Sequence, residues 1–219
     1  MIRSTRRFLV LAALVAAMAA ATLGQSPDLL QSVCDVSETL AVYSATIRMT
    51  QHHGNDDSVI EFEFDFVPPD RMRIVYTAPP TVEGQNMILN GEQFYTYIPS
   101  LRRHVWQAVG EGASNPGEDM GFLFDFVTHA VPEALEGAES HLAEACETFV
   151  LEKTNVALEV GVLTLLADSV QQIVRLNVVD AAPVAIDIFH EDELAMEILV
   201  LDYLLNGVFD EAWFAIPVQ

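Results

Sequence analysis

Residues 60–66 read Ile-Glu-Phe-Glu-Phe-Asp-Phe, a strict alternation of apolar and acidic side chains. Successive side chains of a β-strand point to opposite faces, so this spacing places four apolar side chains on one face and three carboxylates on the other. A strand of this kind belongs to a sheet with one buried and one solvated face, which is typical of antiparallel sheets. The stretch therefore predicts a β-protein whose sheet carries an apolar face.

The alternation continues on both sides of this stretch. The polar residues 51–57 predict a turn, prolines at 68–69 and 79–80 end two strands, and Asn90-Gly91 is a strong hairpin signal because both residues tolerate positive φ. Five antiparallel strands joined in sequence are expected, at residues 43–50, 60–66, 71–77, 85–89 and 94–98.

The rest of the chain predicts two helical regions and a second set of strands. Ser26-Pro27-Asp28 is typical of a helix start, and the helix should end near Ala41. Residues 110–119 predict a loop, residues 120–127 are apolar with pairs at i,i+4, and residues 133–145 predict a helix. Further strands are expected at residues 146–153, 156–166, 173–179, 184–189 and 194–204.

A sheet of eight to ten strands with one apolar face must curl or be covered. We therefore expect a mainly β, α+β fold: a curled antiparallel sheet or half-open β-barrel, with an N-terminal helix and a helical lid insertion. Curled sheets of this kind can enclose a ligand cavity.

The N-terminus has the three parts of a secretory signal. Three arginines in residues 1–7 precede an uncharged run from Phe8 to Leu23, and small residues follow at its end. We expect residues 1–24 to be removed and residues 25–219 to form a single domain in the periplasm. A membrane anchor is the alternative, although the run is short for a spanning helix. Cys34 lies too far from the small residues to be a lipidation site.

The composition is strongly acidic. The net charge of −22 falls to −25 when the leader takes three of the ten basic residues with it. Such a surface repels nucleic acid and anionic lipid head groups, so neither is expected as a primary partner. Solubility explains the acidity, and steering toward a basic partner is the alternative. The 51% hydrophobic content indicates a folded core.

The two cysteines, Cys34 and Cys146, both lie in the mature chain. An even pair in an oxidising compartment favours a disulfide, with two buried free thiols as the alternative.

Several short motifs resemble the outer-membrane lipoprotein carrier proteins, the LolA-like family. They are a proline-started strand over residues 66–76, then Pro79, the Asn90-Gly91 turn, an aromatic strand with Tyr95 and Tyr97 that ends at Pro99, and a closing segment from Asp202-Tyr203 through residues 209–214 to Pro217. The resemblance spans the mature chain.

The resemblance implies a periplasmic half-barrel with a helical lid, acting as a monomer. Such a carrier accepts a lipoprotein from an ABC-type extractor, shields its acyl chains and delivers them to an outer-membrane acceptor. Characterised carriers hold the lid with an Arg just before the first strand-starting Pro, and here that position is Pro68. Arg71 and Arg73 are the nearest substitutes.

The expected acyl-chain site is the apolar face of the first strands. Burial of one methylene stabilises binding by about 0.8 kcal/mol, so two or three long chains need no polar contacts. An ordinary filled core is the alternative interpretation of the same residues. The expected cavity residues are Phe62, Phe64, Phe66, Met72, Ile74, Tyr76 and Met87, and the expected underside of the lid is Phe122, Leu123 and Phe126.

The sequence offers little for catalysis or metal binding. It has no Gly-x-Ser-x-Gly elbow, no His-Glu-x-x-His and no phosphate-binding glycine loop. His52 and His53 are adjacent, so in a strand they point to opposite faces, and Arg102-Arg103 is typical of a solvated turn. We expect a non-enzymatic lipid or lipoprotein carrier with no cofactor. The alternatives are an envelope-stress sensor of the same fold and a structural β-protein with no ligand.

Overall fold

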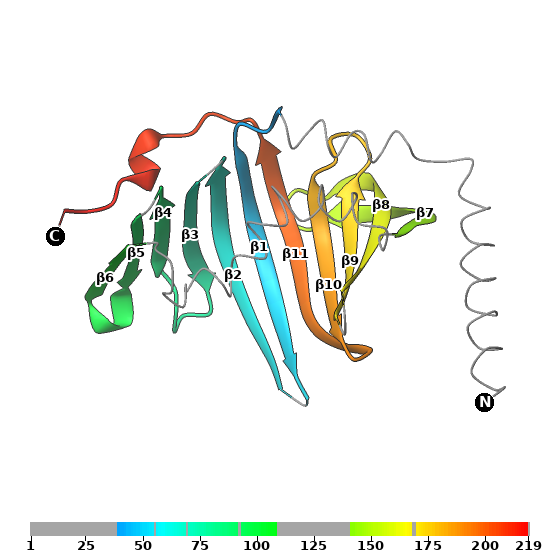
Figure 1. Cartoon of the computed structure of the whole chain (residues 1–219), viewed down its shortest axis with the longest axis horizontal. Helices are drawn as coiled ribbons and strands as arrows, with labels where there is room; N and C mark the ends of the chain where they lie inside the picture. The colour runs from blue at the N-terminus through cyan, green and yellow to red at the C-terminus, as the bar shows by residue number, and fades with distance from the viewer. Residues whose placement is uncertain are drawn as a thin grey trace, which may run out of the picture.

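The computed structural model describes residues 39–54, 56–68, 70–91, 93–108, 141–167 and 170–218, with backbone alone at 141–146 and 165–167. Eleven antiparallel strands form one sheet in the order β6-β5-β4-β3-β2-β1-β11-β10-β9-β8-β7 (Figure 1). Their bounds are β1 Tyr43–His53, β2 Asp56–Val67, β3 Arg71–Ala78, β4 Asn86–Asn90, β5 Gln93–Ile98, β6 Arg103–Ala108, β7 His141–Leu151, β8 Val156–Ala167, β9 Val170–Asn177, β10 Pro183–His190 and β11 Glu193–Leu205.

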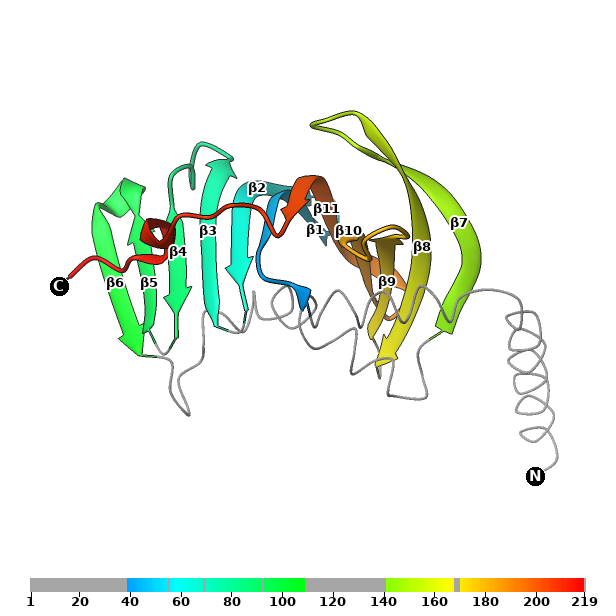
Figure 2. The ribbon, with the colours of Figure 1, turned by 90° about the horizontal axis from the view of Figure 1, so that it is seen from above.

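The sheet consists of two meanders, β1–β6 and β7–β11, joined where the first strand pairs with the last. Tyr43 lies opposite Leu205 at one end of this β1–β11 seam, and Gln51 lies opposite Met196 toward the other. The outermost strands are β6 and β7, so the sheet is open rather than a closed barrel, and it curls along its width (Figure 2). The curled, half-open antiparallel sheet predicted from the sequence is confirmed.

The hairpin of β7 and β8 bends back over the outer face of the seam, as Figure 2 shows. Three contacts hold its tip. Arg48 of β1 donates to Glu152 at 2.9 Å, the Lys153 amine donates to the Thr46 hydroxyl at 3.0 Å, and the Lys153 backbone N–H donates to the Leu201 carbonyl at 3.0 Å.

Each face of the sheet has its own hydrophobic cluster. The larger, here called the inner cluster, includes the alternating apolar residues of β1 to β3 and continues into β9, β10 and β11. The smaller lies on the outer face of β4 and β5, under the C-terminal segment of residues 207–217. A 3-10 helix, η4 (Glu211–Phe214), places Phe214 against Ile88 and Tyr95 there.

Several boundaries differ from those expected. The polar residues 51–54 and 56–57 are strand apart from a turn at Gly54 (φ +66°), because His53 pairs with Asp56. The first meander has six strands rather than five, since Arg103–Ala108 pairs with β5.

Part of the helix expected at residues 133–145 is strand. The helix-favouring residues Leu142 and Ala143 pair with Leu163 and Val162 of β8, and this pairing overrides their local preference. The N-terminal helix ending near Ala41 and the lid lie almost entirely outside the described residues.

Candidate functional site

The seven residues expected to line the acyl site lie side by side in the inner cluster. Six of them are at most 6% exposed, and Tyr76 is half-buried: Phe62, Phe64, Phe66, Met72, Ile74 and Met87 are the buried six. The register explains their proximity, since antiparallel partners point to the same face. Phe64 lies opposite Ile74, and Ile74 lies opposite Met87 on its other side.

Aromatic rings connect this face to the seam. The Phe64 ring meets Tyr43 edge-on at 6.1 Å and stacks on Phe66 at 6.5 Å between centroids. Tyr43 in turn stacks on Tyr203 of β11 at 6.3 Å. The apolar face is therefore continuous from the first meander into the second.

The second meander supplies apolar residues that the sequence reasoning did not assign to the site. They are buried in the same cluster and come from four strands: Leu163, Val174, Leu176, Ile186, Ile198 and Val200. Alternation in residues 184–189 predicted a one-faced strand, and residues 194–204 predicted a last long strand, but which of their faces joined that of β2 depended on the β1–β11 pairing.

A polar cluster lies at the end of the β1–β11 seam where Tyr43 pairs with Leu205. The Tyr203 hydroxyl donates to Asp180 at 2.8 Å and accepts from the Asn177 amide at 2.6 Å. Burial raises the pKa of Tyr203, and burial together with the nearby Tyr203 and Asp180 raises that of Tyr43. Both phenols are thus neutral donors throughout the physiological range, and the group contributes hydrogen bonding rather than acid–base chemistry.

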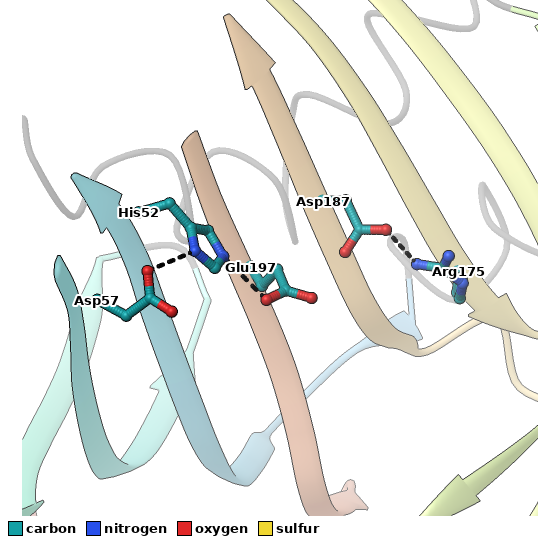
Figure 3. Close-up of polar contacts among 5 residues, drawn as sticks. All are labelled: His52, Asp57, Arg175, Asp187 and Glu197. Carbon is teal, nitrogen blue, oxygen red and sulfur yellow. Dashed lines mark hydrogen bonds and ion pairs between the residues drawn. The ribbon is translucent and has the colours of Figure 1, made fainter. Parts of the chain in front are cut away.

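Charged residues of β2, β1, β11, β10 and β9 form a row on the outer face (Figure 3). His52 of β1 contacts Asp57 of β2 at 2.9 Å through Nδ1 and Glu197 of β11 at 3.0 Å through Nε2. Hydrogen bonds that His52 donates to Asp57 first, and then to Glu197, raise the pKa of His52. Farther along the row, Arg175 of β9 donates to Asp187 of β10 at 2.7 Å.

Arg71 and Arg73 lie on the outer face, opposite the acyl site. Arg71 pairs with Glu211 and lies 5.5 Å above the Phe214 ring, while Arg73 donates to Asp65 at 2.7 Å and lies 5.4 Å above Trp213. Neither therefore faces the predicted acyl residues, and because the lid lies outside the described residues, their role as lid-holding substitutes stays a prediction.

Several expectations fall outside the described residues. Phe122, Leu123 and Phe126 of the lid and Cys34 lie there, and Cys146 is described by its backbone alone. Among the residues that the structure describes, no group of three or more His, Cys, Asp or Glu side chains could hold a metal ion. No helix within the described ranges is long and apolar enough to span a membrane.

No protein-family model matches the chain, and no curated protein matches it by sequence. Solved structures do match. MucB is 11% identical with a TM-score of 0.55, over 87% of this chain and 62% of MucB, and its complex with MucA from Pseudomonas aeruginosa matches at 11% identity, a TM-score of 0.50, and 87% and 60% coverage. This chain therefore spans less than two thirds of MucB.

Two further structures cover the chain more evenly. An uncharacterised conserved protein of Thermus thermophilus is 10% identical with a TM-score of 0.54, over 85% of this chain and 93% of that one. A LolA superfamily protein from Nitrosomonas europaea is 10% identical with a TM-score of 0.39, over 84% and 96%. Identities near one tenth indicate a shared fold alone, and that fold is supported by the Thermus protein and MucB, with TM-scores of 0.54 and 0.55.

Proposed function

We propose that the protein is an exported, non-enzymatic carrier that binds the acyl chains of lipoproteins, or of another lipid, on the inner face of its half-barrel and delivers them toward the outer membrane. The observation that supports this proposal is the apolar face itself. Three phenylalanines of β2 are joined to Met72, Ile74 and Met87 without a charged residue among them. An acyl chain needs only apolar contact, at about 0.8 kcal/mol for each buried methylene.

Binding on this face requires a change in packing. The phenylalanines are already 0–1% exposed, so an acyl chain must replace the groups that now cover them. We infer that cargo and the protein's own side chains compete for the same apolar surface. ABC-type extractors and outer-membrane acceptors are the partners that a lipoprotein carrier would need.

Phe64→Glu tests the proposal. In a filled core the new carboxylate has no partner, and the protein should unfold. On a face that exchanges packing partners for lipid, the carboxylate can retain water. The protein should then melt at a modestly lower temperature and lose retention of a fluorescent fatty acid.

Val59→Glu is the matched control, since Val59 lies on the outer face of the same strand and is 45% exposed. It should keep both the fold and fatty-acid binding. If Phe64→Glu does not fold, Tyr76→Glu repeats the test at a half-buried position of the same face. A folded Phe64→Glu or Tyr76→Glu protein that retains the probe normally contradicts the carrier proposal.

A regulatory half-barrel that contacts a protein partner is the second candidate. The likeness to MucB, which has been solved with MucA bound, favours it. The position of the gene distinguishes the two: an adjacent ABC extractor supports a carrier, and an adjacent sigma-factor cassette supports a regulator. If lipid extraction and mass spectrometry of protein purified from the periplasm recover no lipid, the structural alternative is favoured.

Export has its own test. The mature chain should begin between Ala20 and Ser26, and Cys34 should be bridged to Cys146. N-terminal sequencing and non-reducing peptide mass mapping of periplasmic protein measure both. An intact Met1 would refute cleavage, and two free thiols in freshly isolated protein would refute the disulfide.

A further inference from the structure

Arg103 lies on the inner face at the open edge of the sheet. Its neighbours in β6, His104 and Trp106, contact Tyr95 on the outer face, with ring centroids 6.0 and 5.7 Å apart. Side chains alternate along a strand, so Arg103 lies on the opposite face from these two. The register agrees, because Arg103 lies opposite Ile98, which alternates with the buried inner residue Phe94.

Exposure is low at the acyl site and high at this arginine, with half-buried residues between them. Phe62 of β2 is fully buried, its partner Tyr76 of β3 is half-buried, Ile98 of β5 is half-buried, and Arg103 of β6 is exposed. With strands about 4.8 Å apart, four strand intervals separate Phe62 from Arg103 by roughly 19 Å. The inner face thus changes from apolar to cationic over a distance of about the length of an extended acyl chain.

Arg103 also differs from the other cations in its partners. Four of the seven basic residues in the described part of the chain form ion pairs with carboxylates: Arg48, Arg71, Arg73 and Arg175. Lys153 donates to Thr46. Within the described ranges, neither Arg103 nor its neighbour Arg102 has an ion-pair partner, although the protein carries 32 acidic residues.

We propose that Arg103 binds the oxyanion of a lipid head group, phosphate or carboxylate, while the acyl chain of the same molecule lies on the inner face. This inference rests on the proposed function and specifies its cargo as an anionic amphiphile. The guanidinium presents paired N–H donors that match an oxyanion, and its charge is permanent. Elsewhere the acidic surface repels an anionic head group, so binding of the head group is confined to this edge.

Two single-chain probes with the same tail test the proposal: dodecyl phosphate, which is anionic, and 1-O-dodecylglycerol, which is neutral. Each is titrated calorimetrically into the full mature protein below its critical micelle concentration. Arg103→Gln should weaken dodecyl phosphate binding by about tenfold, the scale of one charge-assisted contact at an exposed site, and change 1-O-dodecylglycerol binding less than twofold. Arg103→Lys should recover part of the loss.

Lys153→Gln is the matched control, since it removes the same charge from the outer side of the molecule and should alter neither probe by more than twofold. Inorganic phosphate alone should not bind, because the dodecyl chain of the probe supplies most of its affinity for the protein. Equal losses for both probes, or unchanged dodecyl phosphate binding in Arg103→Gln, overturn the inference. If Arg103→Gln binds both probes normally but aggregates, the role of Arg103 is instead to prevent the exposed edge strand β6 from pairing with other molecules.

The failure of this inference is distinguishable from failure of the carrier proposal. If the wild-type protein binds neither probe, the carrier proposal itself fails. If the wild-type protein and Arg103→Gln bind both probes equally well, the carrier proposal stands and the head-group site is refuted.

Discussion

Asp65 of β2 differs in exposure from Glu63, the neighbouring acidic residue on the same face of the strand. The Asp65 side chain is 9% exposed, whereas that of Glu63, two positions earlier on the same face, is 53% exposed. The Asp65 carboxylate accepts hydrogen bonds from the Ser44 hydroxyl at 2.8 Å and from Arg73 at 2.7 Å. These two donors offset the cost of removing the charge from water.

Asp65→Ala should lower the free energy of unfolding by about 2 kcal/mol, because it leaves the half-buried Arg73 without its closest partner. Chemical denaturation measures the change. Glu63→Ala is the control: Glu63 is 4.0 Å from Arg73 and largely solvated, so its loss should cost less than about 0.5 kcal/mol. Equal effects of the two variants would show that burial of Asp65 contributes nothing.

At the scale of secondary-structure elements, His52 of β1 connects its own strand to β2 and β11. A neutral imidazole has one N–H and one lone pair, so it can donate to Asp57 or to Glu197 but not to both. The protonated ring donates to both and joins β1 to each of its neighbours. Next along the row, Asp187 lies opposite Glu197 and is paired with Arg175. The arginine keeps its charge at every pH considered, so His52 is the cation of this row whose charge changes near neutral pH.

Protonation of His52 should therefore stabilise the fold in a pH-dependent way. Its folded pKa is raised above the ordinary value of about 6.5, so its contribution is fully present below about pH 6.5 and is lost as the pH rises through the folded pKa. The stability difference between wild type and His52→Gln should be largest near pH 6 and shrink at higher pH. His53→Gln, one position away, is the control, and a difference independent of pH contradicts the assignment.

The C-terminal segment acts as a strap on the outer face of β3, β4 and β6. Phe214 is 1% exposed, the Asn90 amide donates to its carbonyl at 3.1 Å, and the Trp106 indole donates to Pro217 at 3.0 Å. Its position explains why Tyr95 and Trp106, on the outer face, are shielded from water.

Phe214→Ala should cost about 3–5 kcal/mol, as expected for loss of a buried ring, and should increase binding of a hydrophobic dye as the outer cluster is exposed. Trp213→Ala provides the comparison, since Trp213 is 38% exposed and its loss should cost about 1 kcal/mol. Thermal melts and dye fluorescence measure both variants. A larger loss for Trp213→Ala would assign the anchoring to the cation–π contact with Arg73 instead.

At the scale of the whole molecule, the net charge opposes folding. Repulsion among 32 acidic residues destabilises the compact state, and salt screens it over a Debye length of about 10 Å at 0.1 M. Salt also weakens the ion pairs, but exposed pairs contribute about 0–1 kcal/mol each. The repulsion should therefore dominate the response to salt.

The melting temperature at pH 7.5 should rise when NaCl is increased from about 10 to 300 mM, over the range in which screening of surface charges becomes effective. At pH 4.5, close to the isoelectric point of about 4.3, the same increase should have little effect because most of the repulsion is absent. A fall in melting temperature with salt at pH 7.5 would mean that the ion pairs contribute more than the repulsion.

Charge is distributed unevenly over the surface of the molecule. The net charge predicts repulsion of anionic head groups by the surface as a whole, yet two of the three basic residues without ion-pair partners in the described part of the chain, Arg102 and Arg103, are adjacent at one edge. Net charge is a sum over the molecule, whereas a bound head group responds to the charges within a few ångströms.

The sequence by itself determined the faces of the strands. Alternation with a period of two is a local property, so Phe62, Phe64 and Phe66 had to share a face whatever the strand paired with. The Asn90-Gly91 turn was equally local, and Gly91 has the positive φ that the motif requires. The half-open antiparallel sheet followed from repeating such segments.

The tertiary structure alone decided how the two meanders join. His52 and Glu197 are 145 residues apart, and their contact exists because β1 pairs with β11 in one register. The same pairing merges the inner faces of both meanders and places Arg48 beside Glu152. Pairing between distant strands depends on the packing of whole faces rather than on local preference, which is why neither these contacts nor the strand at His141 could be predicted from the segments alone.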